Sequence, residues 1–376
     1  HLSIRRQRQM CIRDSIYPPD SRRWQRVQDL IRALFSSYGY GEISTPAFEE
    51  TALFARSIGE ETDIVGKEMY TFTDRGDRSL TLRPEGTAPV VRAYLERNLG
   101  AAGAATKLYY IGPFFRYERP QANRTRQFYQ AGVELFGVAS PAADAEVIEL
   151  ASRTLERLGI DDAQILLNSI GCDACRPDYT GALVKYASGK EELCETCRRR
   201  LDKNPLRLLD CKVPSCKEVL KGAPVPLDSL CGGCRAHLDE TISLLGRLDV
   251  QVTLEPGLVR GFDYYTGTVF EAACERLGAR SAVIGGGRYD RLVEDLGGRP
   301  TPAVGFAAGL AGLVELACLP KDEGGMEAYV VHLSEADLPD AMALASRLRR
   351  AGLTVEVSLE QRSVKAQMRA ADKVGA

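Results

Sequence analysis

The residues best suited to chemistry lie in one stretch, residues 115–134, where an arginine-rich loop joins two runs with the alternation of β-strands. Side chains alternate along a strand, so the second run is expected to place four residues on one face: Phe128, Gln130, Gly132 and Glu134. That face offers a ring, an amide, a bare backbone and a carboxylate, with Arg116 and Arg124 at its entrance. Guanidinium groups pair with phosphates and a carboxylate pairs with a cation, so the stretch predicts a ligand that carries both.

A second segment, residues 258–267, combines an arginine next to a glycine with an acid and two tyrosines. The residues are Arg260, Gly261, Asp263, Tyr264 and Tyr265. Ordinary aromatic packing would explain one tyrosine but not the whole combination. The arginine offers a rigid fork to phosphate oxygens, and the glycine allows a ligand to approach the backbone. This segment is therefore a second candidate for ligand binding.

Three shorter motifs have both a structural and a functional interpretation. Glu85 and Thr87 precede a predicted helix, where they either cap it or bind an ammonium group. The glycines at residues 285–287 either form a turn or allow a ligand to approach, and they match neither a P-loop nor a dinucleotide fingerprint. The arginines at residues 198–200 form either a solvated helix face or a local patch for nucleic acid.

Length, charge and hydropathy narrow the class of protein. A chain of 376 residues can form two or three domains with a sizeable core. The formal net charge of −2 gives no global field that attracts nucleic acid, so any such binding depends on local patches. The sequence has no long apolar run and no secretory signal, so we expect a cytoplasmic protein with no membrane association. The three histidines lie away from these motifs, so a histidine base is not expected.

The elements that must position these motifs follow an α+β pattern, with mostly antiparallel strands and helices in runs. Helices are predicted at about residues 20–35, 87–98, 142–158, 309–317 and 337–350. Strands are predicted at residues 107–111, 114–119, 128–136, 165–168, 250–254, 267–272, 329–333 and 353–357.

Composition divides the chain into four parts. Residues 1–15 form an N-terminal arm without periodicity, and residues 16–320 form the main domain. Residues 171–245 are an inserted subdomain, because they hold eight of the eleven cysteines. Residues 326–376 begin a new α/β pattern that is too small to fold well alone, so it packs on the rest or the chain is cut short.

The cysteines of the inserted subdomain form four close pairs. The pairs are Cys172 with Cys175, Cys194 with Cys197, Cys211 with Cys216, and Cys231 with Cys234. Two such pairs together make a four-thiolate site, so structural zinc is one interpretation. The other is reduced cysteines packed as small hydrophobic residues. A cytosolic setting disfavours disulfides.

Taken together, these motifs resemble histidyl-tRNA synthetase, a class II aminoacyl-tRNA synthetase, over roughly residues 16–376. Residues 38–46 are similar to the family's dimer motif and residues 115–134 to its second motif. Residues 258–271 look like its histidine-specific motif, and residues 285–290 like the companion of that motif. The resemblance implies a homodimer whose antiparallel sheet of six or seven strands is flanked by helices. It also implies that L-histidine and ATP form histidyl-adenylate, followed by transfer to tRNA(His).

The resemblance also implies a role for each candidate residue. Glu85 and Thr87 would bind the amino group of histidine. The imidazole would be read by four side chains: Gln130, Glu134, Tyr264 and Tyr265. ATP would enter with Mg²⁺ and be bound by Arg116, Arg124, Phe128 and Arg260, with Phe128 on adenine and Arg124 on the outer phosphates. Arg116 and Arg260 would be the catalytic pair, facing each other across the α-phosphate. The inserted subdomain would reach toward the acceptor stem of the tRNA.

The chain departs from the family at two places. Residues 302–310 look like the third motif, but Ala311 and Gly312 stand where the family has Glu-Arg. That arginine packs on adenine and contacts the last phosphate in the family, so ATP use is expected to be weaker. Residues 326–376 resemble only the first part of the anticodon-binding domain, so a protein ending at Ala376 is expected to recognise the anticodon poorly.

Two alternatives compete with a ligase. A regulatory paralogue, such as the regulatory subunit of ATP phosphoribosyltransferase, would bind histidine without catalysis, and Gly312 favours it. A relative that uses a different amino acid is the other, and the combination of Arg260, Tyr264 and Tyr265 argues against it.

Overall fold

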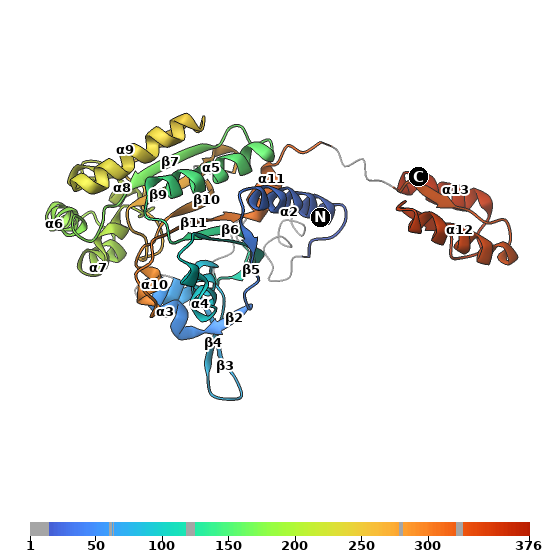
Figure 1. Cartoon of the computed structure of the whole chain (residues 1–376), viewed down its shortest axis with the longest axis horizontal. Helices are drawn as coiled ribbons and strands as arrows, with labels where there is room; N and C mark the ends of the chain where they lie inside the picture. The colour runs from blue at the N-terminus through green and yellow to red at the C-terminus, as the bar shows by residue number, and fades with distance from the viewer. Residues whose placement is uncertain (1–14, 60–61, 63, 118–124, 278–280, 321–325) are drawn as a thin grey trace. The chain divides into compact units, whose positions relative to one another are not determined.

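A computed structural model describes residues 15–59, 62, 64–117, 125–277, 281–320 and 326–376. The chain forms two compact units, His1–Cys318 and Leu319–Ala376 (Figure 1). Each unit has its own buried core. They are described in turn below.

The first unit is built on an eight-stranded sheet with the order β1-β5-β6-β11-β10-β9-β7-β8. Every neighbouring pair from β5 to β7 is antiparallel, and only the short edge strands β1 and β8 pair in parallel. The predicted antiparallel sheet is confirmed, with eight strands in place of six or seven. The bounds are β1 Gly41–Glu42, β5 Thr106–Phe115, β6 Gln127–Phe136, β7 Gln164–Ser169, β8 Val252–Leu254, β9 Thr268–Cys274, β10 Ser281–Arg288 and β11 Ala303–Gly309.

One face of the sheet is covered by the helices α2 (Asp20–Ser37), α5 (Pro141–Arg157) and α11 (Leu310–Leu316). Helix α5 starts after Ser140 with Pro141 in its first turn, where a missing N–H leaves no bond unmade. Its apolar residues recur at helical spacing and are buried against the strands: Val147, Ile148, Leu150, Ala151 and Leu155. Helix α9 (Gly232–Arg247) packs on α5 (Figure 1).

Further helices and a small sheet lie across the large sheet from α5 and α9 in the view of Figure 1. The small sheet consists of β2 (Phe48–Glu50), β4 (Ser79–Leu82) and β3 (Tyr70–Thr73). The helices are α3 (Thr51–Ile58), α4 (Thr87–Glu96) and α10 (Leu292–Asp295), and a π-helical turn, η1, spans Ile64–Glu68. Helix α4 packs Val90, Val91 and Tyr94 on strand residues of the large sheet, including Tyr110 and Phe136. These packed elements fix where α4 begins, beside the candidate site.

A helical segment connects β7 to β8, which pair in parallel and therefore need a crossover connection. It contains α6 (Arg176–Ala187), α7 (Glu195–Lys203), η3 (Pro205–Leu208), α8 (Pro214–Leu220), η4 (Pro226–Ser229) and α9. Its own small core consists of Ala187, Leu193, Cys197, Leu208, Cys211 and Cys216.

The second unit is a βαβ arrangement followed by another helix. Strands β12 (Ala328–Val330) and β13 (Val355–Val357) pair in parallel, joined through α12 (Leu338–Arg350). Helix α13 (Val364–Val374) starts where the Ser363 hydroxyl accepts a hydrogen bond from the Ala366 N–H. The buried core of this unit is small: Ala341, Ala345, Val355 and Val357.

Two local predictions need correction. Residues 107–111 and 114–119 were expected as separate strands, but β5 continues through Pro113 and ends at Phe115. Pro113 is tolerated because β1 pairs β5 only at Leu108 and Tyr109, which leaves this part of β5 on an open edge. The glycines at residues 285–287 lie inside β10, so their interpretation as a turn is wrong.

Candidate active site

The two arginines singled out in the sequence, Arg116 and Arg260, line the same cavity of about 200 Å³. Its floor is formed by the central strands β5, β6, β10 and β11. Five other residues proposed from the sequence line it as well: Glu85, Thr87, Gln130, Tyr264 and Tyr265. The structure therefore brings together side chains from three separate segments of the chain, within residues 85–87, 116–130 and 260–265. Phe128 lies beside Arg116, and Glu134 does not line the cavity but is hydrogen-bonded to Thr87, which does; Arg124 lies outside the described residues.

Arg116 is held by one hydrogen bond and two aromatic rings. Its Nε donates to the carbonyl oxygen of Pro84 at 2.8 Å. The guanidinium lies 5.3 Å from the ring centre of Phe128 and 5.7 Å from that of Phe262. Such contacts orient the planar group without using its terminal nitrogens. Arg116 can therefore present those nitrogens to an anion in the cavity.

Arg260 is held by an acidic partner and a glycine. Its Nη1 donates to Glu271 Oε2 at 2.6 Å. Its guanidinium lies directly over Gly285 in β10, and a Cβ atom at that position would overlap it. Gly285 therefore leaves room for the side chain of Arg260, which the sequence alone did not indicate.

Glu134 is buried on β6 and accepts two hydrogen bonds. The Thr87 hydroxyl donates to its Oε1 at 2.8 Å, and the Tyr289 hydroxyl donates to its Oε2. Across the ladder, Gly305 leaves room for the carboxylate, because a Cβ there would overlap Oε2. Burial raises the pKa of Glu134 to about 8, although both hydroxyl donors oppose the rise. The side chain is therefore poised to gain or lose a proton near neutral pH.

Glu85 both caps a helix and lines the cavity. Its carboxylate accepts from the backbone N–H of Thr87 at 2.6 Å and from that of Ala88 at 2.9 Å, at the start of α4. The capping interpretation of this motif is therefore confirmed, and it does not exclude a ligand. Burial raises the pKa of Glu85, against the effect of the two backbone donors.

The cavity contains buried polar atoms that the described part of the protein does not satisfy. They are Gln130 Oε1, Tyr110 Oη and Arg260 Nε. Buried polar atoms are nearly always hydrogen-bonded, so their presence in one cavity indicates a polar ligand. A ligand with both donors and acceptors is needed to satisfy them.

Two tyrosines of the site were missed in the sequence. Tyr110 lies on β5 opposite Gly132, and Tyr289 follows β10 and donates to Glu134. Alternation from Gly285 through Gly287 puts Tyr289 on the same face, which is the signal that could have identified it. Tyr110 has a weaker signal, because its neighbour Tyr109 is equally aromatic and is also buried.

The segment around Tyr264 and Tyr265 is tied to the helical connection between β7 and β8. The rings of the two tyrosines lie 4.8 Å apart, and Phe262 stacks on Tyr264 at 5.1 Å. Arg176, at the start of α6, donates through Nη2 to the carbonyl oxygen of Tyr265 at 2.8 Å.

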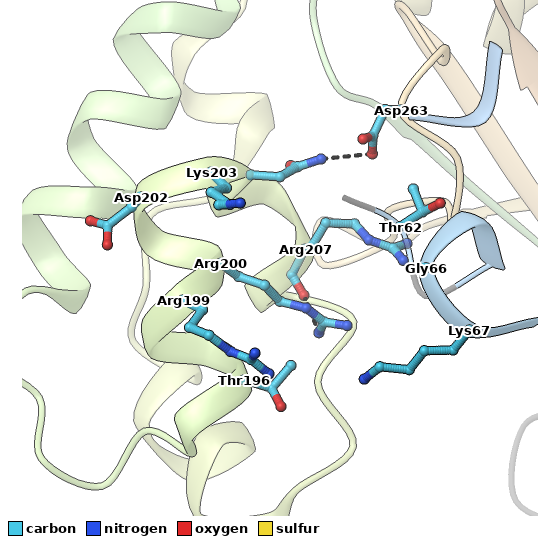
Figure 2. Close-up of a pocket in the computed structure, with 11 residues that line it drawn as sticks. Thr62, Gly66, Lys67, Thr196, Arg199, Arg200, Asp202, Lys203, Arg207 and Asp263 are labelled. Carbon is cyan, nitrogen blue, oxygen red and sulfur yellow. Dashed lines mark hydrogen bonds between the residues drawn. The ribbon is translucent and has the colours of Figure 1, made fainter. Parts of the chain in front are cut away.

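A second, basic cavity of about 320 Å³ lies between η1 and α7 (Figure 2). Its cationic residues are Lys67, Arg199, Arg200, Lys203 and Arg207. Asn204, at the end of α7, donates to Asp263 Oδ1 at 2.6 Å, so α7 is bonded to the segment that carries Arg260. Of the arginines at residues 198–200, two therefore line a cavity.

The eight cysteines of the helical connection form two clusters of four. One contains Cys172, Cys175, Cys231 and Cys234; the other contains Cys194, Cys197, Cys211 and Cys216. The sequence predicted the close pairs but did not show which pair joins which. Each cluster has the ligand set of a metal site.

An antiparallel sheet flanked by helices, with two arginines and a buried carboxylate around a cavity on one face, defines a class II aminoacyl-tRNA synthetase fold. The family model described as histidyl-tRNA synthetase matches residues 12–313. The chain belongs to the histidyl-tRNA synthetase family and is thus an aminoacyl-tRNA synthetase. The resemblance drawn from the sequence motifs is confirmed.

Individual relatives agree with this assignment. A histidine–tRNA ligase of Desulfitobacterium hafniense is 50% identical over 358 residues, covering 94% of this chain and 84% of that protein. The apo histidyl-tRNA synthetase of S. aureus is 36% identical with a TM-score of 0.81, covering 97% and 88%. A Bacillus halodurans structure titled as an ATP phosphoribosyltransferase regulatory subunit/histidyl-tRNA synthetase has a TM-score of 0.70, covering 95% and 94%. At 24% identity, that likeness shows the fold alone. The regulatory alternative is not favoured, because the family model and the relatives at about 50% identity are those of histidine–tRNA ligases.

The third motif places Ala311 and Gly312 in the first turn of α11, directly after β11. A Cβ at Gly312 would lie 3.2 Å from Leu277 Cδ1 and 3.4 Å from Val283 Cγ1.

In the part of the chain that the structure describes, no helix has the length and apolar character needed to span a membrane.

Proposed function

We propose that this chain joins L-histidine to tRNA(His), with histidyl-adenylate as the intermediate. A carboxylate oxygen of histidine attacks the α-phosphorus of ATP, and the bond to pyrophosphate breaks. A terminal ribose hydroxyl of the tRNA then attacks the carbonyl carbon of the adenylate, and AMP leaves. The observation that carries the proposal is that Arg116 and Arg260 line one cavity together with Thr87, which donates to the carboxylate of Glu134.

Histidine would lie against β6, in the part of the cavity that contains most of the acceptors. Glu85 and Thr87 would bind the ammonium group, because an ammonium offers three donors to nearby oxygens. The imidazole would be read by the carboxylate of Glu134, with Gln130, Tyr264 and Tyr265 around it. Two observations support this assignment: Glu134 is buried, and Gln130 Oε1 is unsatisfied within the described residues.

The arginines would stabilise the charge that builds on the phosphate oxygens during adenylate formation. Preorganised cations act strongly there, because they need not reorient as the reaction proceeds. Arg116 and Arg260 would contact the α-phosphate, and Phe128 would stack on adenine. Arg124, outside the described residues, would contact the outer phosphates. ATP would enter as its Mg²⁺ complex, in which the ion bridges phosphate oxygens.

The other parts of the chain would serve the tRNA and the dimer. The helical connection at residues 171–245 would face the acceptor stem, and the unit at residues 326–376 would belong to an anticodon-binding domain. Residues 38–46, which include the edge strand β1, would contribute to a homodimer interface. A tRNA ligase of this kind would work in the cytoplasm, where ATP and tRNA meet.

Histidine-dependent ATP–pyrophosphate exchange tests the proposal directly. Exchange is expected with histidine and not with other amino acids, since Glu134 provides a buried acceptor suited to an imidazole N–H. Histidine binding measured by calorimetry without any exchange would contradict the proposal and favour a regulatory protein.

Restoring the family's Glu-Arg at the third motif is expected to raise the exchange rate. The double variant Ala311→Glu/Gly312→Arg adds a guanidinium at the start of α11, and a hydrogen bond to a charged group contributes about 1.5–3 kcal/mol. That range corresponds to roughly a 10- to 100-fold gain in kcat/KM for ATP. Leu277 must shift by a few tenths of an ångström to admit the side chain.

The single variant Ala311→Glu is the control, and its exchange rate is expected to stay near that of the parent chain. An unchanged kcat/KM in the folded double variant would mean that another cation already makes the contacts with adenine and the last phosphate. Circular dichroism of each variant verifies that it is folded.

A further inference from the structure

We propose that the helical connection between β7 and β8 holds two structural zinc ions, one in each four-cysteine cluster. In both clusters, the four sulfur atoms lie within 4.8 Å of one another. This inference concerns the architecture of the connection and is independent of the chemistry proposed for the cavity.

The distances between sulfur atoms fit a single tetrahedral ion. In the first cluster, the Sγ of Cys172 lies 3.8 Å from that of Cys175 and 3.9 Å from that of Cys231. In the second, the Sγ atoms of Cys194 and Cys211 are 3.9 Å apart. Zinc–sulfur bonds of about 2.3 Å in a tetrahedron place sulfur atoms about 3.8 Å apart. A disulfide needs about 2.05 Å, and all eight cysteines are free.

The local backbone places helix N-termini and a backbone N–H group at the sulfur atoms. Cys175, Cys194 and Cys231 occupy the N-cap positions of α6, α7 and α9, where the helix dipole stabilises negative charge. The backbone N–H of Cys194 also donates to the Sγ of Cys216 at 3.1 Å. Hydrogen bonds of this kind orient and stabilise metal-bound sulfur. Cysteines packed only as small hydrophobic residues would need neither feature.

The ligand set identifies the ion and its role. Four thiolates form a closed coordination shell, which is typical of structural rather than catalytic zinc. Soft sulfur ligands exclude Mg²⁺ and Ca²⁺, which prefer oxygen. A four-iron cluster binds each cysteine to a different iron and therefore needs a wider arrangement of sulfurs. Zinc is the common ion that fits the observed spacing.

The helical connection also needs such a crosslink to be stable. Three of the six buried residues in its separate core are cysteines, Cys197, Cys211 and Cys216, so little aliphatic surface is buried there. Small units of this kind usually require disulfides or metals. The first cluster joins Cys172 to Cys231 across 59 residues and thereby fixes the start of α6 against the start of α9. The free energy of metal binding would then contribute to folding.

Residues next to the two clusters form hydrogen bonds with the segment that carries Arg260. Arg176 follows Cys175 and donates to the carbonyl oxygen of Tyr265. Asn204, which ends the helix that begins at Cys194, donates to Asp263. Arg207 Nη1 donates to the carbonyl oxygen of Arg260 at 3.3 Å. Metal loss is therefore expected to loosen this segment as well as the connection itself.

Metal analysis of the whole chain, purified without chelators and dialysed against zinc and then zinc-free buffer, tests the inference. We expect two zinc ions per chain, and one each in Cys175→Ser and Cys197→Ser. The controls Cys274→Ser and Cys318→Ser alter cysteines outside the clusters and are expected to keep two. Less than one zinc per wild-type chain, or stoichiometric iron instead, would overturn the proposal.

A second measurement covers variants that fail to fold. Titration of the wild-type chain with a mercurial thiol reagent is expected to release two zinc ions as the eight cluster thiols react, and an indicator dye reports the metal. Thiol reaction without zinc release would contradict the sites. Because this readout needs no catalysis, a missing pyrophosphate exchange would count against the proposed function and not against the zinc sites.

Discussion

Replacing Arg260 with alanine is expected to lower histidine-dependent ATP–pyrophosphate exchange by about 100- to 1,000-fold, while histidine affinity changes only a few-fold. The guanidinium would act on charge that develops at the α-phosphorus, and this charge is greatest in the transition state. One positioned donor to such an oxyanion contributes roughly 3–4 kcal/mol. Exchange kinetics give the first quantity, and calorimetry with histidine alone gives the second.

Two controls separate catalysis from structure. Arg260→Lys keeps a positive charge but loses the fork, so we expect intermediate exchange. Glu271→Gln weakens the 2.6 Å ion pair that holds Arg260 and is expected to cost less than the removal of the arginine. An equal loss of exchange and of histidine affinity in Arg260→Ala would mean that the residue acts on ground-state binding.

Short-range patterns in the sequence predicted much of this architecture. Alternation along 128–136 placed Gln130 and Glu134 on one face, and the glycine–arginine–tyrosine combination marked the segment at Arg260. What a pattern could not give was contact between distant segments. That Gly285 serves Arg260 and Gly305 serves Glu134 depends on strand order and register, which are set by the packing of the whole sheet. The sequence also could not show which cysteine pairs join in each cluster, because that depends on contact between distant segments.

Glu85 shows a different limit of sequence reasoning. A carboxylate before a helix suggested either a cap or an ammonium site, and the structure shows a cap whose side chain also lines the cavity. Both uses need an anionic oxygen at the same place, so residue type alone cannot separate them. Tyr110 and Tyr289 were missed because an aromatic residue in a strand is usually core, and these two are buried like core residues.

Replacing Glu134 with glutamine is expected to stabilise the ligand-free protein at alkaline pH and to weaken histidine binding. Burial raises the pKa of Glu134 to about 8, so the folded state holds a proton that the unfolded state loses at much lower pH. The stability that this proton contributes is complete in acid and is lost as the pH rises toward 8. Glutamine, an uncharged isostere of the protonated acid, does not titrate.

The difference in unfolding free energy between Glu134→Gln and the wild type is therefore expected to grow from pH 5 to pH 8.5. One pKa unit corresponds to about 1.4 kcal/mol, so the gain should reach a few kcal/mol. In the opposite direction, the lost charged acceptor for imidazole should weaken histidine binding by roughly 10- to 100-fold. Thermal unfolding across this pH range and calorimetry with histidine measure the two effects.

Glu49→Gln is the matched control. Glu49 is also a largely buried carboxylate, but it pairs with Arg92 at 2.7 Å and does not line the cavity. Burial raises the pKa of Glu49 as well, although Arg92 opposes the rise. Its replacement also removes an ion pair, so we expect a smaller alkaline stabilisation than in Glu134→Gln, and unchanged histidine affinity. If Glu134→Gln instead lost stability at pH 8.5, the carboxylate would have to be anionic in the empty site, held by the hydroxyls of Thr87 and Tyr289. Histidine would then enter a charged pocket, and its affinity would show no gain as the pH rises through 8.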